Sequence, residues 1–372
     1  MPVPAALRGR FLLWMVFAPL AHFESDYHEA HPCLRIKSTD GKQESIALTK
    51  ASSDTAIYAL MDYFERQGKI EELTAVGHRV VHGADRIHPI WINHETMEEM
   101  QRLVPLAPLH QPHNLSPIMH IRRKYPHLPQ VACFDTSFHR TLPWLAETYA
   151  LPQELRGKGV KRYGFHGLSY EYIALKLPEL FPPEQRERVI AVHLGSGCSA
   201  CALKDGKSIA TTMGFTALDG LMMRTRCGAL DPGAVLYLIR EQGYTPEKLE
   251  RLLYEESGLK GLTGGSGDTR DILASVKTDE HAWQALELFC YMAAREIAGL
   301  IAVLGGMQAL IFTGEIGVHE VEIRAGIAKY FNWLKINILV QPTDEALMIA
   351  RHTLDMWNRR KRAGHGHAPR AA

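Results

Sequence analysis

The sequence predicts an α/β fold, because short apolar runs that end in tight turns alternate along the chain with longer segments of helical periodicity. The chain has 372 residues, more than one domain usually holds, which favours two domains. Hydrophobic residues make up 46% of the chain and charged residues 22%, as in ordinary globular proteins. Both proportions are compatible with a sizeable buried core.

Four segments are predicted to contain buried strands, since each has an apolar or β-branched run that closes on a Gly or an Asp. Segment 188–203 reads as a strand, a glycine turn and a second strand. Strand-to-glycine turns of this kind are typical of phosphate-handling loops, although each alone is weak evidence. The predicted strand segments are 74–83, 131–139, 188–203 and 309–317.

Helices are predicted where apolar residues recur at spacings of three and four. The segments that show this pattern are 247–254, 281–304 and 344–358. The last of them is expected to begin after Thr343 as its N-cap, with Pro342 just before it.

The charge balance and the cysteines narrow the class of protein. Lys plus Arg number 42 and Asp plus Glu 41, a net charge of +1, which gives no broad electrostatic attraction for nucleic acid. Cys198 and Cys201 form one C-x-x-C without a second pair, so we interpret them as small buried thiols rather than zinc or redox ligands. Reduced thiols are typical of a cytoplasmic protein.

The N-terminal segment carries an apolar run, Phe11 to Leu20, preceded by Arg8 and Arg10. The run resembles the core of a weak signal peptide, but it is too short to cross a bilayer as a helix. We interpret it as an atypical start and expect neither export nor a membrane anchor.

Transfer of a phosphoryl group from ATP requires cations around the moving group, backbone N–H groups around the remaining phosphates, and a divalent metal. Seven motifs supply these parts in one order: GHRVVHG (77–83), APLHQPHN (107–114), FDTSFHRTLP (134–143), RYGFHGLSY (162–170), HLGSG (193–197), MGFTALDGLMMRTRCG (213–228) and PTDEALMIARHT (342–353). Together, from Thr74 to Thr353, they resemble the acetate kinase family. The resemblance implies reversible phosphoryl transfer between ATP and acetate or another short acid, giving acetyl phosphate and ADP, as part of acetyl-CoA metabolism.

The family resemblance also implies the architecture. It consists of two ribonuclease H-like domains, of the actin-like and sugar-kinase-like type, that face each other across a nucleotide cleft, usually in a homodimer. The first domain would comprise residues 1–136 with the returning helix in 343–372 and bind the acid. The second, residues 137–342, would bind the nucleotide.

Four residues match the family's catalytic positions. Arg79 and Arg226 resemble the two active-site arginines, and a guanidinium fork suits carboxylate and phosphate oxygens. His166 resembles the histidine that contacts the transferring phosphoryl group. Asp135 would orient the acceptor and an arginine; because it ends a buried strand, a partner such as Arg79 or a metal is expected.

The remaining site residues follow from the same resemblance. Those that match substrate-side positions are Arg79, Val81, Leu109, His110 and Phe165, although core packing is nearly as good an explanation for Val81, Leu109 and Phe165. Those that match nucleotide-side positions are His193, Leu194, Gly195, Ser196, Gly197, Asp268, Thr269, Arg270, Gly314, Glu315, Ile316 and Gly317. Glu345 would bind Mg²⁺ through a water molecule, and Mn²⁺ could replace Mg²⁺.

The sequence departs from the family pattern in several places. The usual first turn, Asn-x-Gly-Ser-Ser-Ser-x-Lys, has no counterpart in residues 1–50, and its loss would remove a strand and leave a neighbouring strand at an edge. Ser196 stands for Asn, Ala217 for Pro, and Glu315 brings negative charge to a glycine-rich turn. These departures leave open the alternative that the chain is an impaired or truncated acetate kinase homologue, which binds nucleotide without turnover. A metal-dependent hydrolase built on His110 and His113 is a distant third hypothesis.

Overall fold

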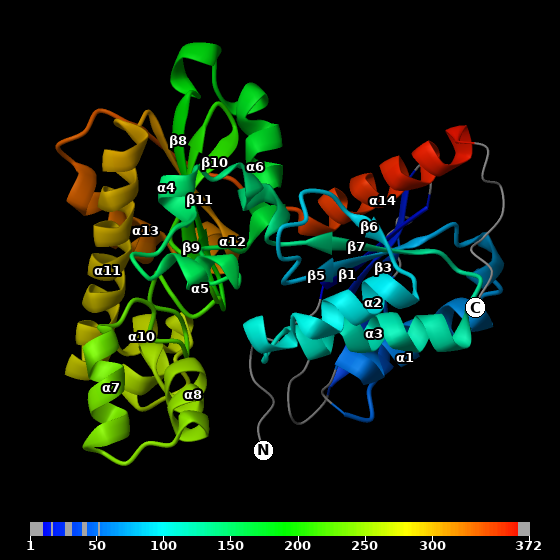
Figure 1. Ribbon diagram of the computed structural model, residues 1–372, viewed down its shortest axis with the longest axis horizontal. Coiled ribbons are helices and arrows are strands. Elements are labelled where there is room, and N and C mark those ends of the chain that lie inside the picture. Colours follow the sequence, from blue (N-terminus) through cyan, green and yellow to red (C-terminus); the bar gives the residue numbers. More distant parts are fainter. Residues whose placement is uncertain (1–9, 16–17, 27–31, 39–42, 51–52, 364–372) are drawn as a thin grey trace. The chain divides into compact units, whose positions relative to one another are not determined.

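The computed structural model describes residues 10–15, 18–26, 32–38, 43–50 and 53–363. The chain divides into two compact units (Figure 1). Unit 1 comprises Met1–Ser137 with Asp344–Ala372, and unit 2 comprises Phe138–Thr343. Each unit is described by itself below.

Unit 2 is built on a mixed five-stranded sheet. Strands β8 (Arg188–Leu194), β9 (Cys198–Lys204) and β10 (Lys207–Thr211) form an antiparallel meander, and β11 (Ala309–Thr313) and β12 (Asn337–Val340) continue it in parallel with β8. The resulting order is β10-β9-β8-β11-β12. This order, with three antiparallel strands followed by two parallel ones, is that of a ribonuclease H-like domain.

Helices cover both faces of this sheet, as Figure 1 shows. The long helix α11 (Glu280–Leu304) packs along β9 and β10, and α6 (Gly167–Leu180) packs on the opposite face. All five residues of β11 are buried, which explains why the strand is an unbroken apolar run. The other helices of the unit are α4 (Trp144–Glu147), α5 (Gln153–Gly157), α7 (Pro232–Arg240), α8 (Pro246–Glu255), α9 (Gly258–Thr263), α10 (Thr269–Ser275), α12 (Gly314–His319) and α13 (Val321–Ala328).

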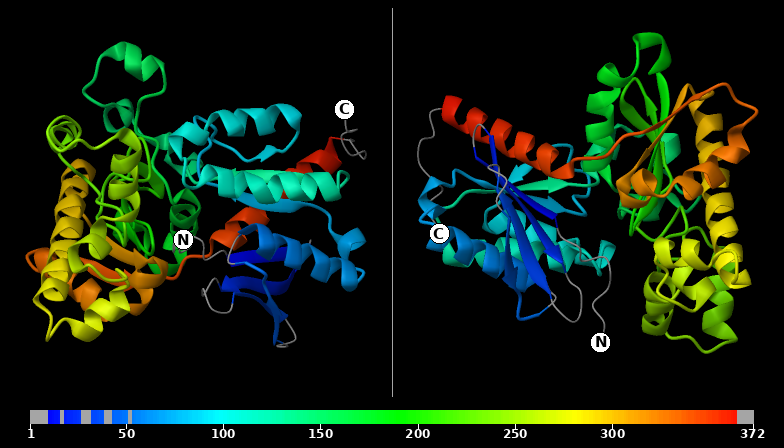
Figure 2. Two further views of the ribbon diagram at one scale, coloured as in Figure 1. Left: turned by 90° about the horizontal axis from the view of Figure 1, so that it is seen from below. Right: turned by 180° about the vertical axis from the view of Figure 1, so that it is seen from behind.

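Unit 1 contains a three-stranded sheet between two layers of helices. Strand β5 (Val76–Val80) runs parallel to β7 (Gln130–Phe134), and β6 (Ile90–Trp91) joins β7 on its other side. Figures 1 and 2 show α14 (Glu345–Arg362) on one face of this sheet. The opposite face carries α2 (His94–Arg102) and α3 (Gln111–Lys124), with α1 (Ser53–Arg66) packed against α3.

The N-terminal part of unit 1 is an antiparallel sheet in the order β1-β2-β3-β4. Its strands are β1 (Arg10–Met15), β2 (Ala18–Asp26), β3 (Cys33–Ser38) and β4 (Gln43–Ala47). The expected loss of the first strand is therefore wrong, because residues 10–15 form one and pair with β2. Residues 16 and 17 lie outside the described part. Among the described residues, no helix has the length and apolar character needed to cross a membrane.

The sequence-based element predictions hold, with corrections at the ends. The helices expected over 247–254 and 281–304 are α8 and α11, and each predicted strand segment contains a strand. The N-cap of α14 is Asp344 rather than Thr343, since the Asp344 side chain accepts a hydrogen bond from the Leu347 backbone at 2.9 Å. The helix also runs four residues beyond the predicted Asn358, to Arg362, and its basic last turn suits the negative end of the helix dipole.

Candidate functional site

In unit 1, the structure brings together three predicted site residues, Arg79, Asp135 and Glu345. The Nε and Nη2 atoms of Arg79 donate to both carboxylate oxygens of Asp135, at 3.0, 3.1 and 2.6 Å. The Nη1 atom of the same guanidinium lies 2.9 Å from Oε2 of Glu345. The expectation that Arg79 is the partner of Asp135 is confirmed.

The parallel pairing of β5 and β7 explains this convergence. Arg79 lies opposite Cys133 in the register, and the backbone N–H of Asp135 donates to the carbonyl of Val80 at 3.1 Å, just past the end of β7. Asp135 is 1% exposed, so its charge requires a close partner. Burial works against the charge of Arg79, but the carboxylates of Asp135 and Glu345 raise its pKa above the ordinary value. The guanidinium therefore stays charged.

Helix α14 approaches β5 at Gly77, which has no side chain to keep the two apart. A Cβ atom on Gly77 would lie 2.5 Å from Cγ2 of Ile349 and would also meet the side chain of Thr353, both on α14. We expect Gly77→Ala to push α14 outward, because both contacts are too close for a methyl group. The free energy of unfolding should fall by about 1–3 kcal/mol, and the ion pair between Arg79 and Glu345 should weaken.

Urea unfolding of the Gly77→Ala variant measures this effect. The control is Gly157→Ala at the end of α5, where no atom lies within 4 Å of the added Cβ. A Gly77 variant as stable as the wild type would show that the close approach of α14 does not constrain the position of Glu345.

The other substrate-side candidates of unit 1 lie beside α3. Val81 is 7% exposed, and its backbone N–H donates to Oδ1 of Asn114 at 3.0 Å. Leu109 and His110 are partly buried and precede α3, with His110 at its N-cap. His113 lies on α3 itself. Within the described ranges, no three His, Cys, Asp or Glu side chains are grouped so that they could hold a metal ion.

In unit 2, His166 and Arg226 converge on the glycine-rich turn between β8 and β9. A Cβ atom on Gly197 would lie 3.0 Å from Nε2 of His166 and 3.1 Å from Nη2 of Arg226. Both side chains are buried, 9% and 7% exposed. Only glycine leaves this space open, so the absent side chain makes room for a third group between the imidazole and the guanidinium.

Arg226 differs from Arg79 in having no carboxylate partner among the described residues. The Nη1 atom of Arg226 donates to the carbonyl oxygen of Ala217, at 2.7 Å. Burial lowers the pKa of Arg226, and the nearby Cys198 and Tyr254 oppose that shift. A buried guanidinium without a counter-charge is costly, and such groups are concentrated at sites that bind anions.

The nucleotide-side turn is held by close backbone contacts. The N–H of Gly195 donates to the carbonyl of Gly197 at 3.1 Å, which leaves Ser196 exposed at the tip. Gly314 has φ +78°, and a Cβ there would lie 2.5 Å from the carbonyl oxygen of Leu194. The first residues of α12, Gly314 to Gly317, therefore pack directly against the end of β8.

The remaining nucleotide-side candidates cluster at the start of α10. Asp268 caps this helix and pairs with Arg270 at 2.8 Å, and the hydrogen bond from Arg270 lowers the pKa of Asp268 to about 2. Thr269 between them is 6% exposed. The hydrogen bond to Asp268 raises the pKa of Arg270, and the charge of Glu315 adds to this shift. The negative charge expected at the glycine-rich turn thus lies near a cation.

The supporting roles of Gly258 and Ala217 could not be predicted from the sequence. Gly258 has φ +63°, and a Cβ atom there would collide with the carbonyl oxygens of Met223 and Arg226, so only glycine allows this close approach to the loop that carries Arg226. Ala217 contributes only its carbonyl oxygen, which explains why the substitution of Pro by Ala leaves that acceptor in place. A positive φ and a backbone acceptor cannot be recognised from residue type.

Cys198 and Cys201 lie on β9 and are completely buried. Burial raises the pKa of Cys198 to about 11 and that of Cys201 to about 12. Both remain protonated thiols, as the interpretation as small buried residues requires.

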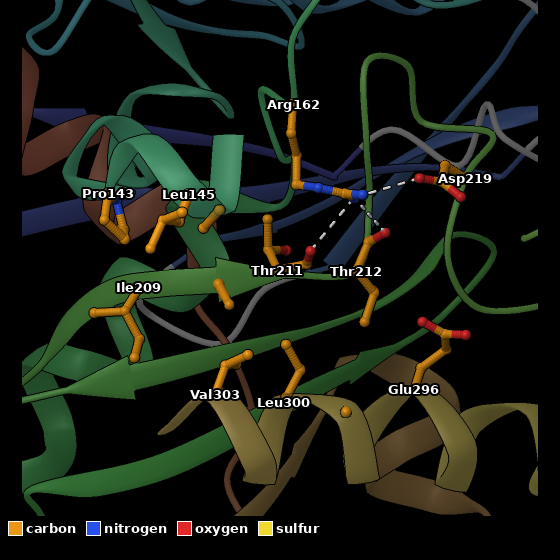
Figure 3. Close-up of a pocket in the computed structure, with 13 residues that line it drawn as sticks. Pro143, Leu145, Arg162, Ile209, Thr211, Thr212, Asp219, Glu296, Leu300 and Val303 are labelled. Atoms are coloured by element: carbon orange, nitrogen blue, oxygen red, sulfur yellow. Dashed lines mark hydrogen bonds and ion pairs between the residues drawn. The ribbon is translucent and has the colours of Figure 1, made fainter. Parts of the chain in front are cut away.

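A cavity of about 510 Å³ in unit 2 lies between α4, β10 and α11 (Figure 3). It includes none of the predicted site residues. Its polar side chain Arg162 is already engaged, since Nη1 donates to the carbonyls of Thr212 at 3.0 Å and Met213 at 2.9 Å and lies 3.3 Å from Asp219. Arg162 therefore ties the RYGFHG segment to the end of β10, and we assign no chemistry to this cavity.

Comparisons with known proteins identify the family of this chain. The sequence model of the Acetokinase family matches residues 23–351. An acetate kinase of Rhodopseudomonas palustris is 46% identical over 348 residues, covering 86% of this chain and 87% of the relative. An acetate kinase of Nitrobacter hamburgensis is 49% identical over 304 residues, covering 76% and 75%. The crystal structure of a propionate kinase from Francisella tularensis superposes with a TM-score of 0.82 at 32% identity, covering 90% of this chain and 92% of that one. These similarities confirm the expected α/β fold of the actin-like and sugar-kinase-like type, and the chain belongs to the acetokinase family.

Proposed function

We propose that this chain catalyses reversible phosphoryl transfer between ATP and acetate, or another short carboxylic acid, giving acetyl phosphate and ADP. A carboxylate oxygen attacks the γ-phosphorus, a new P–O bond forms, and the bond to the bridging oxygen of ADP breaks. The acid is already ionised at neutral pH, so no base is required. Catalysis then depends on positioning and on stabilising negative charge.

The observation that carries the proposal is the buried guanidinium of Arg226 beside Nε2 of His166. Both groups border the space that Gly197 leaves open, and no carboxylate among the described residues neutralises Arg226. A cation and an imidazole nitrogen around a glycine-rich turn can stabilise the equatorial oxygens of a phosphoryl group. We assign this role to the two residues, with the backbone of Leu194 to Gly197 binding the other phosphates.

The acid is assigned to unit 1. Arg79 is held in a fixed orientation by Asp135 and Glu345, which pre-organises its fork for a carboxylate or a phosphoryl oxygen. Val81, Leu109 and His110 are the residues of unit 1 that we assign to the acid-binding region, and Phe165 keeps the substrate-side role that the family resemblance implies. An apolar pocket discriminates by about 1–3 kcal/mol per methylene, so the enzyme should use more than one short acid.

Magnesium would be held through Glu345. The carboxylates of Asp135 and Glu345 are hard oxygen donors on either side of Arg79, and Mg²⁺ in kinases is bound by one or two carboxylates together with substrate phosphates and water. The residues present fit this pattern. When bound, the ion would neutralise charge on the nucleotide phosphates, and Mn²⁺ can take the same ligands.

Trapping the acyl phosphate with hydroxylamine tests the proposal. With the full chain, MgATP and acetate, we expect a hydroxamate whose formation requires both substrates. Chelating the metal with EDTA should abolish the product, and added Mg²⁺ should restore it. Propionate and butyrate measured in parallel give the acid preference.

A chain that binds ATP but forms no hydroxamate with any of the three acids would contradict the proposal. That result would favour a homologue that binds nucleotide without turnover. A rate unaffected by EDTA would separately contradict the role of the metal.

The assembly proposed is a homodimer formed through unit 2. Large apolar side chains stay exposed on α7 and α11, among them Tyr237 at 54%, Trp283 at 53% and Tyr291 at 50%. Such side chains favour burial against a second copy. Sedimentation velocity should give twice the mass of 41.8 kDa, and a monomer at all concentrations would rule the dimer out.

The reaction is assigned to the cytoplasm as a step of acetyl-CoA metabolism. ATP as co-substrate supports this compartment, and the six cysteines are free thiols, as expected where the thiol pool is reduced. Cell fractionation with the intact protein tests the assignment, and recovery outside the cytoplasm would contradict it.

A further inference from the structure

His166 is connected through its second ring nitrogen to a chain of buried hydroxyl groups. Its Nδ1 lies 2.8 Å from Oγ of Ser199 on β9. The same Oγ forms a short hydrogen bond with the phenolic oxygen of Tyr170 on α6. Ser199 and Tyr170 are both 0% exposed, so their protons must be placed on partners within the protein.

The direction of these hydrogen bonds follows from counting protons. Burial raises the pKa of Tyr170 well above its ordinary value, so the phenol is protonated, and a hydrogen bond from the backbone of His193 works against that shift. The phenolic proton therefore has Oγ of Ser199 as its acceptor. The Ser199 proton then has Nδ1 of His166 as its acceptor.

The opposite arrangement leaves a buried proton without an acceptor. If Nδ1 of His166 carried the proton, Oγ of Ser199 would accept from both His166 and Tyr170. The Ser199 proton would then have no acceptor among its two partners. A buried donor without an acceptor is strongly destabilising, which decides in favour of the first arrangement.

We propose that Tyr170 and Ser199 are positioning residues that hold His166 as the neutral Nε2–H tautomer, so that it donates a hydrogen bond toward the space beside Gly197. The assignment of the receiving oxygen to a phosphoryl group rests on the proposed function. His193 adds to the positioning, since its ring stacks on His166 with centroids 4.3 Å apart and an interplanar angle of 19°. Oγ of Ser169 fixes His193 in turn, at 2.9 Å from its Nδ1.

The backbone conformation of His166 also indicates that the residue is held by its surroundings. The residue has φ +59° and ψ +26° and forms the N-cap of α6, a left-handed conformation that is rare for a residue with a Cβ atom. The surrounding contacts must therefore compensate for the strain. The hydrogen bond to Ser199 and the stacking on His193 are two such contacts.

A second buried histidine in unit 2 provides a matched comparison. Nδ1 of His139 lies 2.8 Å from Oγ of Ser208, the same distance as in the pair of His166 and Ser199. Nε2 of His139, however, lies 2.9 Å from the carbonyl oxygen of Phe165. A carbonyl can only accept, so it fixes the Nε2–H tautomer of His139 without help from Ser208.

The tautomer of His166 can be measured directly by ¹⁵N NMR of the full chain with labelled histidine, assigned by comparison with the His166→Gln variant. At pH 7.5 we expect a ring protonated at Nε2 and not at Nδ1. A ring protonated at Nδ1, or at both nitrogens, would overturn the proposal. This readout does not depend on turnover, so an inactive chain with the expected tautomer would contradict the proposed function while supporting the assignment.

Activity measurements on three variants complete the test. Ser199→Ala should lower kcat about tenfold, by analogy with the loss of groups that orient metal-bound histidines, with little change in KM for ATP. Tyr170→Phe should lower kcat less, because Ser199 can still donate to Nδ1. Ser208→Ala, the control, should leave kcat and the His166 tautomer unchanged.

Circular dichroism and urea unfolding of each variant show whether a loss of kcat comes from a changed orientation of His166 or from a loss of folded protein. If Ser199→Ala does not fold, Tyr170→Phe and the wild-type spectrum still decide the question. Equal losses of kcat in Ser199→Ala and Ser208→Ala, with an unchanged His166 tautomer, would show a merely structural role and end the proposal.

Discussion

Replacing Arg226 by Ala is expected to lower kcat by about 10³-fold or more while KM for MgATP changes little. The physical reason is that Arg226 is a buried, uncompensated cation, 7% exposed, beside Nε2 of His166. An arginine that stabilises the transition state of phosphoryl transfer contributes about 10³–10⁵ in kcat. Steady-state kinetics with acetate and MgATP give both constants.

Two further variants separate this role from a structural one. Arg226→Lys keeps a charge but loses the fork that donates to Ala217 and extends toward Gly197, so it should recover only a small part of the rate. Arg251→Ala removes an exposed arginine whose partner is Glu256, and kcat should not change. If Arg226→Ala changed kcat and KM to the same extent, or neither, the assigned role would be wrong.

Replacing Arg79 by Ala is expected to abolish measurable turnover and also to destabilise unit 1. Asp135 is 1% exposed and would lose all three hydrogen bonds from Arg79. Breaking a fully buried ion pair costs about 3–5 kcal/mol, but the Arg79 side chain is 38% exposed. We therefore expect a smaller loss, about 2–3 kcal/mol, after discounting for screening by solvent. Urea unfolding and the hydroxamate assay measure the two effects.

The matched control for Arg79 is Arg86→Ala. Arg86 pairs with Glu99, and each of these side chains is 34% exposed, so the variant should cost less than about 1 kcal/mol and keep full activity. In Arg79→Lys, the retained charge should restore part of the stability but little of the activity, since an ammonium group cannot bind both oxygens of Asp135 in a fork. An active Arg79→Ala variant would refute the assignment of the acid side.

The site residues that could be predicted from the sequence are those whose environment is indicated by the neighbouring residues in the chain. The apolar run that ends at Asp135 predicted a buried carboxylate, and a buried carboxylate requires a cation, so its pairing with Arg79 was expected and is confirmed. The glycine turn within 188–203 predicted a phosphate-handling loop. The structure adds that Gly197 leaves space between His166 and Arg226.

Other features depend on three-dimensional neighbours that no local pattern reveals. Ser199 is one serine in a buried strand, and only the pairing of β8 with β9 and the position of α6 bring it between His166 and Tyr170. Thr343 and Asp344 are adjacent, and either residue type is a common N-cap. Only the backbone geometry shows that Asp344 caps α14. That both groups of residues, one in each unit, act on the same phosphoryl group stays a prediction.

The most direct test of phosphoryl transfer to a carboxylate is ³¹P NMR of the wild-type chain with MgATP and acetate. We predict that the ATP resonances decline while ADP and an acyl phosphate appear in equal amounts. Adding excess ADP and acetyl phosphate should then regenerate ATP. Inorganic phosphate formed in place of the acyl phosphate, or spectra that do not change, would contradict the account.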